Sequence, residues 1–259
     1  MKHAPRRVRL DLAYDGTSFA GWQMQRSQRT VQGMIEQALS EIQGAERVKV
    51  RGAGRTDAGV HARQQVADFE IASRLDDASL ERALSRMLPA DVRPLRVATT
   101  AATFHAQNDA VSKTYRYRLD VSPYGDPLQS RYALHYPYPL EMRRLQSALP
   151  SLVGRRDWSG FAASGCDKID RVRTLSEARL ERITEDTWDL VFSADGFLQH
   201  MVRNLVGTLL EIGGGRMAET TIQEVLSSGD RRQAGPTAAA RGLCLERVRY
   251  ADDERGAST

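Results

Sequence analysis

The sequence predicts an α+β fold in which helices cover one side of an antiparallel sheet. Strands with alternating apolar residues recur in both halves of the chain, and helices with an apolar stripe stand between them. The first hundred residues run strand, helix, strand, strand, helix, strand. Hydrophobic residues make up 41% of the 259 residues and charged residues 27%, which is ordinary globular usage and excludes a disordered or collagen-like chain.

The first half is expected to hold four strands and two helices. The strands are 8–14, 47–51, 65–71 and 92–99, and the helices are 31–42 and 80–88. Leu10 and Leu12 alternate with polar residues, as in a half-buried strand. The second helix has Asp76 or Asp77 available as its N-cap and Pro89 as its stop.

The second half repeats this pattern without any visible sequence repeat. Its expected strands are 115–121, 173–183, 188–193 and 243–250, and its expected helices are 140–149, one from about 198, and 222–226. We therefore predict an N-terminal α+β half over 1–110, a C-terminal α+β half over 111–250 and a disordered tail over 251–259.

The cysteines and the apolar runs bear on the compartment. Cys166 and Cys244 stand far apart, which favours unpaired thiols in a reducing environment. Apolar runs are too short to span a membrane, and no apolar segment follows the basic N-terminus as in a signal peptide. These features predict a cytoplasmic protein.

The charge is unevenly distributed. The formal net charge is +4, residues 1–65 carry a net +5, and 33 of the 37 basic residues are Arg. Arg suits phosphate because its planar fork binds two oxygens, although a genome rich in G and C also raises the Arg content. The asymmetry points to a polyanionic partner such as a nucleic acid.

The segment 51–62 is rich in glycine and carries a single carboxylate, Asp57, between Arg51, Arg55 and His61. A dinucleotide-binding G-x-G-x-x-G fails because Asp57 occupies the third glycine position, and no phosphate-binding G-K-[ST] follows. Cationic neighbours favour an ionised carboxylate, as a nucleophile requires. The alternative is that Asp57 only caps a turn, a common role for Asp beside Gly.

Two other enzyme classes fit poorly. A glycoside hydrolase needs two carboxylates flanking the bond, and this loop offers one. Metal-dependent hydrolysis needs a His, Cys and Asp cluster at ligand spacing, which the sequence does not show.

Several segments together resemble the tRNA pseudouridine synthase A family. The Gly-Ala-Gly-Arg-Thr-Asp-Ala-Gly-Val-His-Ala run at 52–62 resembles its active-site signature. The other matching segments are 14–19 with 21–23, 31–32, 104–106 with 113–117, 196–198 with 201–203 and 207, and 242–243. They follow the family's order along nearly the whole chain.

The resemblance implies isomerisation of uridine to pseudouridine at positions 38, 39 and 40 of the tRNA anticodon stem and loop. It makes Asp57 the nucleophile, places Tyr115 on the target base, pairs Arg203 with the Asp57 carboxylate, and sends Arg55 into the stem. It also implies two ferredoxin-like halves around a central antiparallel sheet, a homodimer, and no need for a metal or an organic cofactor. Whether Asp57 attacks the base or C1′ of the ribose is left open.

The residues themselves allow plainer interpretations. Tyr115 lies on the apolar face of its strand and fits a core position, and Arg203 fits a solvated surface position. Phe19 and Trp22 fit core positions better than stacking on RNA. A non-catalytic tRNA-binding or RNA-folding protein is the alternative function.

Three positions depart from the family pattern. Trp158 stands where Phe is usual, Cys244 replaces a common Tyr, and Gln107 stands where Arg is frequent. The exchange at Trp158 should preserve packing, whereas Gln107 removes one possible phosphate contact. None of these three departures falls on Asp57, Tyr115 or Arg203.

Overall fold

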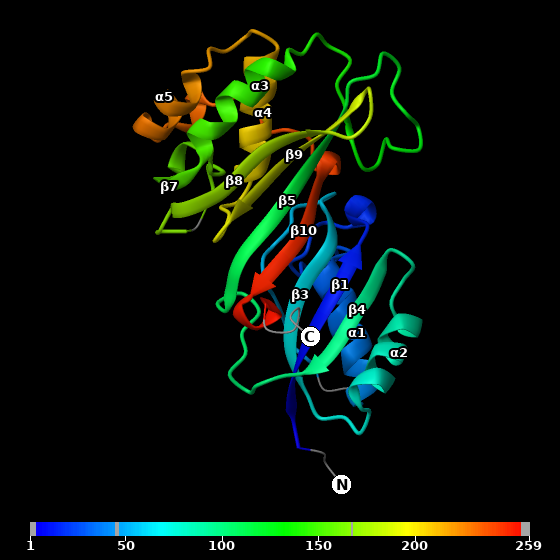
Figure 1. Cartoon of the computed structure of the whole chain (residues 1–259). Coiled ribbons are helices and arrows are strands. Elements are labelled where there is room, and N and C mark those ends of the chain that lie inside the picture. Colours follow the sequence, from blue (N-terminus) through cyan, green and yellow to red (C-terminus); the bar gives the residue numbers. More distant parts are fainter. Residues whose placement is uncertain (1–3, 45–46, 167, 255–259) are drawn as a thin grey trace. The chain divides into compact units, whose positions relative to one another are not determined.

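The computed structural model describes residues 4–44, 47–166 and 168–254, and the chain divides into two compact units (Figure 1). Unit 1 comprises the chain up to Val111 and again from Leu245, and unit 2 comprises Ser112–Cys244. Both units combine helices with mainly antiparallel strands, so the predicted α+β fold is confirmed. None of the helices in the described ranges is long and apolar enough to cross a membrane.

Unit 1 is built on a sheet in the strand order β4-β1-β3-β10, with β2 also paired to β3. Its strands are β1 Arg6–Tyr14, β2 Val50–Gly52, β3 His61–Ile71, β4 Val92–Thr99 and β10 Leu243–Tyr250, and its helices are α1 Val31–Gln43 and α2 Asp77–Met87. In β1, Leu10 pairs with Ala67 of β3 and with Val97 of β4. β1 therefore lies inside the sheet, as its alternating pattern requires.

Both helices of unit 1 begin at a side-chain cap and pack on the sheet (Figure 1). The Thr30 hydroxyl accepts a hydrogen bond from Gly33 N at 3.3 Å, and the Asp76 carboxylate accepts one from Ser79 N at 2.7 Å. Each cap satisfies a main-chain donor that the helix leaves open. The apolar residues between sheet and helices are fully buried, namely Val8, Leu10, Leu12, Ile35, Leu39, Leu80 and Leu84.

The residues that follow β10 are held in place, contrary to the tail predicted from residue 251. Ala251–Glu254 form a short 3-10 helix. The Asp253 carboxylate accepts hydrogen bonds from Tyr250 N at 3.0 Å and from Arg9 Nη1 at 2.9 Å, and the Arg9 guanidinium lies 4.6 Å from the centre of the Tyr250 ring. These charged contacts order the segment, and the predicted disorder of 255–259 falls outside the described residues.

Unit 2 is built on the strand order β5-β9-β8-β7, with the short β6 paired in parallel to β5. Its strands are β5 Ala110–Asp120, β6 Leu134–His135, β7 Gly154–Asp157, β8 Val172–Arg182 and β9 Thr187–Ala194, and its helices are α3 Met142–Ala148, α4 Met201–Gly213 and α5 Thr221–Ser228. The parallel pair makes this sheet mixed, because a long loop brings β6 back along β5.

Short 3-10 segments connect these elements. They are Gly16–Ser18, Leu149–Leu152, Ser159–Phe161, Arg231–Gln233, Ala240–Gly242 and the C-terminal turn already described. Trp158 before the third of them is fully buried, and its indole nitrogen donates to Arg173 O at 3.0 Å. The larger aromatic ring at this position thus fits the core, as expected.

The division between the units differs from the predicted halves at the C-terminal end. The chain passes from unit 1 to unit 2 between Val111 and Ser112, one residue from the predicted boundary, and residues from Leu245 return to unit 1. The return follows from strand pairing, because β10 completes the sheet beside β3.

Candidate active site

The glycine-rich segment forms a loop of unit 1 that connects β2 to β3 and carries Arg55 and Asp57. The Arg55 side chain is exposed, and Asp57 is half-buried. A turn follows Asp57, in which Val60 N donates to Asp57 O at 3.1 Å and Gly59 adopts φ +78°. The loop therefore carries one cation and one carboxylate two positions apart in the sequence.

Main-chain and side-chain bonds hold the residue on the N-terminal side of Asp57. Thr56 O accepts from Trp22 N at 3.0 Å, and the buried Thr56 hydroxyl lies 2.9 Å from the Tyr14 hydroxyl. Gln65 Nε2 donates to Gly54 O at 2.9 Å. These contacts fix the backbone that carries the carboxylate, which is the preorganisation that a nucleophile requires.

Gly21 makes the approach between the first loop of the chain and the Asp57 loop possible. Its φ is +95°, and a Cβ on it would lie 2.6 Å from Thr56 O and 3.1 Å from the Asp57 carbonyl carbon. A side chain at this position would both strain the backbone and push the Asp57 loop away. Steric contact with the Asp57 loop therefore explains why glycine stands before Trp22 in the segment 21–23.

Phe19 and Trp22 belong to the core of unit 1, as predicted. Phe19 is 3% exposed and Trp22 is 2% exposed. The Arg29 guanidinium lies 4.0 Å from the centre of the Phe19 ring and is held by two 2.8 Å hydrogen bonds to Asp91. Neither ring is available to stack on a base.

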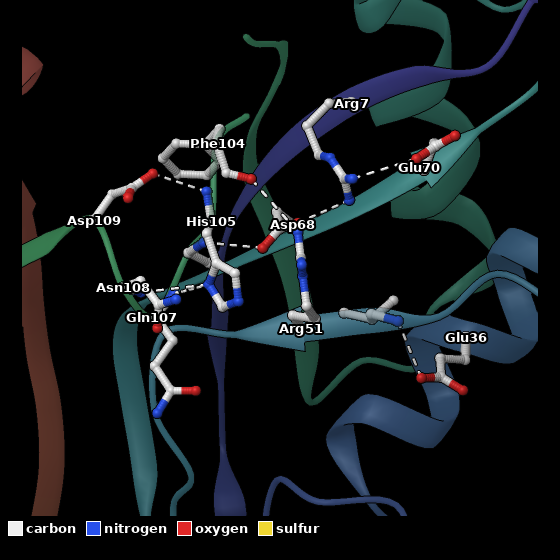
Figure 2. A network of polar contacts seen from close by, with 12 residues as sticks. Arg7, Glu36, Arg51, Asp68, Glu70, Phe104, His105, Gln107, Asn108 and Asp109 are labelled. Atoms are coloured by element: carbon white, nitrogen blue, oxygen red, sulfur yellow. Dashed lines mark hydrogen bonds and ion pairs between the residues drawn. The ribbon is translucent and has the colours of Figure 1, made fainter. Parts of the chain in front are cut away.

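A buried carboxylate on β3, that of Asp68, anchors the loop that precedes β5. Figure 2 shows Arg7 and Arg51 converging on Asp68 of β3, which is fully buried. Asp68 accepts hydrogen bonds from Arg7 Nη1 at 3.1 Å, from Arg51 Nε at 3.1 Å and from Ala106 N at 2.9 Å. The Phe-His-Ala segment at 104–106 is thereby tied to the strand that follows the Asp57 loop.

Tyr115 of unit 2 is packed as a core residue. It is 7% exposed and pairs across the sheet with Phe192 of β9. Its ring meets Phe197 edge-on, with ring centres 5.1 Å apart and planes at 86°. The core interpretation holds for the packing of Tyr115, and its role toward a base stays a prediction.

Arg203 lies in the first turn of α4 and is half-buried, so the plainer interpretation as a solvated surface residue does not hold. Its Nε donates to Ala238 O at 2.8 Å, while Ala238 N donates to Arg203 O at 3.0 Å. The neighbouring Tyr117 hydroxyl donates to Ala239 O at 2.8 Å, and burial raises the pKa of Tyr117, which keeps it neutral. The segment after Gln233 therefore fixes the Arg203 side chain at its Nε.

Asn204, the next residue of α4, anchors that segment. Its side chain is fully buried, and Nδ2 donates to Phe161 O at 2.7 Å. Its Oδ1 accepts from Thr237 Oγ1 at 2.6 Å and from Arg231 Nη2 at 3.0 Å. Asn204 thus uses both ends of its amide to hold the backbone that orients Arg203.

One turn further along α4, Gly207 allows the segment to lie directly on the helix. A Cβ at Gly207 would stand 1.6 Å from Pro236 O. Gly235 N, on the same segment, donates to Thr208 Oγ1 at 2.9 Å. The close approach depends on the missing side chain.

The structure places the four predicted residues in two groups. Arg55 and Asp57 share one loop of unit 1, and Tyr115 and Arg203 belong to β5 and α4 of unit 2. The pairing of the Asp57 carboxylate with Arg203 stays a prediction. Sequence patterns missed the supporting role of Asn204, whose only signal is a polar residue within the apolar face of α4.

Comparison with known proteins agrees with these motifs. The family model described as tRNA pseudouridine synthase matches residues 12–108 and 148–251. A tRNA pseudouridine synthase A of Streptococcus pneumoniae (strain Taiwan19F-14) is 42% identical over 247 residues, which cover 94% of this chain and 98% of the relative. The protein of the same name from Streptococcus equi subsp. equi (strain 4047) is 43% identical over 248 residues, again covering 94% and 98%. The chain, matched over most of its length by both comparisons, belongs to the tRNA pseudouridine synthase family.

Proposed function

We propose that the protein isomerises uridine to pseudouridine at positions 38, 39 and 40 of the tRNA anticodon stem and loop. Membership of the family supports the reaction. The observation that carries the assignment of the nucleophile is the Asp57 carboxylate, half-buried on a loop whose backbone is held at Thr56 and Gly54.

The chemistry needs a nucleophile and no redox step. The N1–C1′ bond breaks, uracil turns, and a C5–C1′ bond forms, while C5 loses a proton and N1 gains one, so that atoms balance. Asp57 forms the transient covalent adduct, at the base or at C1′, and is released at the end. Arg203 pairs with the carboxylate and orients it.

A uridine within a stem must leave the base stack before it can react. Extruding a base costs a few kcal/mol. The exposed Arg55 enters the stem in its place, and stacking of the base on Tyr115 contributes roughly 1–3 kcal/mol toward that cost. The homodimer and the cytoplasmic location expected from the family complete the proposal.

The test uses unmodified anticodon-arm RNA, with pseudouridine mapped nucleotide by nucleotide in the presence of a chelator. Asp57→Asn is compared with Asp76→Asn, a matched control because Asn caps a helix as well as Asp does. We expect pseudouridine at 38–40 from the wild type and the control, and none from Asp57→Asn, whose RNA affinity stays within a few fold. Turnover by Asp57→Asn near the wild-type rate would remove Asp57 from the mechanism.

The same assay tests the non-catalytic alternative. A tRNA-binding or RNA-folding protein would bind the RNA tightly and leave its uridines unchanged in every sample. That result would refute the proposed isomerisation while preserving the RNA partner.

A further inference from the structure

Lys113 lies on β5 two residues before Tyr115, so both side chains project from the same face of the strand. It pairs across the sheet with Ala194 of β9, which pairs in turn with Leu175 of β8. Lys113 is half-buried on this largely apolar face. Among the residues that the structure describes, no carboxylate lies within ion-pair distance of its ammonium group.

A second cation, Arg173 of β8, reaches the same end of the face. Its side chain is 19% exposed. A Cβ built on Gly196 would lie 3.1 Å from Arg173 Nε, so the guanidinium stem lies against Gly196, the neighbour of Phe197. Phe197 in turn packs on Tyr115. Arg173 therefore lies beside the residue that precedes Phe197, and Lys113 lies on the same face of β5 as Tyr115.

The carboxylates nearby form one long ion pair with Arg173 and none with Lys113 among the described residues. The closest to Arg173 is Asp170, at 3.8 Å and 79% exposed. Asp195 accepts hydrogen bonds from Thr174 N with both of its oxygens, at 3.0 and 3.1 Å. Among the described residues, the three cations Lys113, Arg173 and Lys168 exceed the carboxylates Asp170 and Asp195 by one charge.

This excess is unfavourable in the free protein. Burial, and then the positive charges of Arg173 and Lys168, lower the pKa of Lys113 to about 8, against the opposing effect of Asp195. A partly desolvated ammonium group without a carboxylate partner, beside a guanidinium whose one ion pair is 3.8 Å long and exposed, destabilises a fold unless an anion joins them. A structural ion pair would instead bring its own carboxylate.

We propose that Lys113 and Arg173 bind a phosphodiester group of the RNA, next to the nucleotide whose base Tyr115 receives. The proposal rests on the function proposed above for Tyr115. Each extruded nucleotide carries phosphodiester groups on both sides of its ribose, so an anion accompanies the base into the site. A guanidinium fork with an ammonium group is the donor set that suits such a phosphate.

The experiment measures binding of anticodon-arm RNA as a function of salt for Lys113→Met, Arg173→Gln and the double variant. Arg179→Gln is the matched control, because Arg179 lies on the same strand and is paired with Glu177 and Glu181. We expect each cation removed at the site to weaken binding by about tenfold to a hundredfold. The salt slope should fall by about 0.7–0.9, the value for one phosphate that the protein no longer neutralises. Arg179→Gln should leave both the affinity and the slope unchanged.

A second readout identifies the phosphate. RNAs with one neutral methylphosphonate linkage at a time should show a single linkage that weakens wild-type binding and has no further effect in the double variant. Lys113→Arg, which keeps the charge, should bind like the wild type. Lys113→Met should melt at an equal or higher temperature than the wild type, because it removes an unpaired charge.

Three results separate failure of this inference from failure of the proposed function. Wild-type protein that forms pseudouridine, together with a double variant of unchanged salt slope, would overturn the phosphate site alone. Lys113→Met that melts at a clearly lower temperature would also overturn it, since the charge would then stabilise the fold. Wild-type protein that forms no pseudouridine would refute the proposed function on which the inference rests.

Discussion

Replacing Gly207 by Ala tests whether the segment after Gln233 positions Arg203. The added Cβ would stand 1.6 Å from Pro236 O, whereas Cβ contacts under 3.0 Å are essentially never seen. The segment must therefore retreat by at least about 1.4 Å, because the atom it meets belongs to the backbone. That movement breaks the two hydrogen bonds that join Arg203 to Ala238, at 2.8 and 3.0 Å.

The expected effects on stability and on activity differ in size. Overpacking costs about 1–3 kcal/mol, and Ala in place of Gly in a helix returns about 0.8–1.0 kcal/mol. The net loss of about 0–2 kcal/mol lowers the melting temperature by at most about 8 °C. Displacing a catalytic group by about 1 Å can cost about a hundredfold in rate, so we expect pseudouridine formation to fall by that order while the protein stays folded.

The assay combines a thermal melt with single-turnover pseudouridine formation at a temperature where every variant is folded. Gly165→Ala is the control, because a Cβ added there meets no atom within 4 Å among the described residues. A Gly207→Ala variant that turns over within threefold of the wild type would refute the argument that this segment holds Arg203 in place.

Contacts elsewhere in the chain give three further expectations. A bound phosphate raises the pKa of Lys113 from about 8, so the affinity for anticodon-arm RNA should be constant below about pH 7 and weaken by up to about tenfold per pH unit above 8. Anisotropy titrations at constant salt measure this affinity. A wild-type pH profile as flat as that of Lys113→Met would contradict the expectation. Leu84→Ala empties a fully buried site under α2 and should lower the free energy of unfolding by about 2–5 kcal/mol in urea titrations, so a loss below about 1 kcal/mol would mean that this helix is not packed as described. Asp253→Asn weakens the 2.9 Å ion pair with Arg9 and should cost about 1–3 kcal/mol by the same measurement, whereas an unchanged midpoint would show that the C-terminal turn contributes nothing.

Local patterns were enough to predict most of the elements. The strand over 92–99 was predicted with its observed ends, and Asp76 was one of the two N-caps expected for α2. The burial of Phe19 and Trp22 also followed from their apolar character. Period and capping chemistry act over a few neighbouring residues, which is why a sequence displays them.

Contacts between distant segments were not predictable in this way. The plainer interpretation placed Arg203 at the surface, because nothing in the sequence shows that Arg203 donates to the main chain of Ala238, 35 residues later. The ordered turn after Tyr250 depends on Arg9 at the other end of the chain. Lys113 was predictable only in part. The alternation of Tyr115 and Tyr117 extends back to Lys113 and indicates its strand face, but nothing in the sequence places Arg173 near Lys113.

The return of the chain to unit 1 at Leu245 has a consequence for biosynthesis. Unit 2 interposes about 130 residues between the first part of unit 1 and its last strand, and a ribosome needs roughly 7–25 s to add them at its usual pace. During that interval one edge of β3 lacks β10, and an open edge is a site for wrong pairing. Truncation of the chain before Leu245 would therefore remove most of β10 and damage the sheet that contains the first strand of the protein.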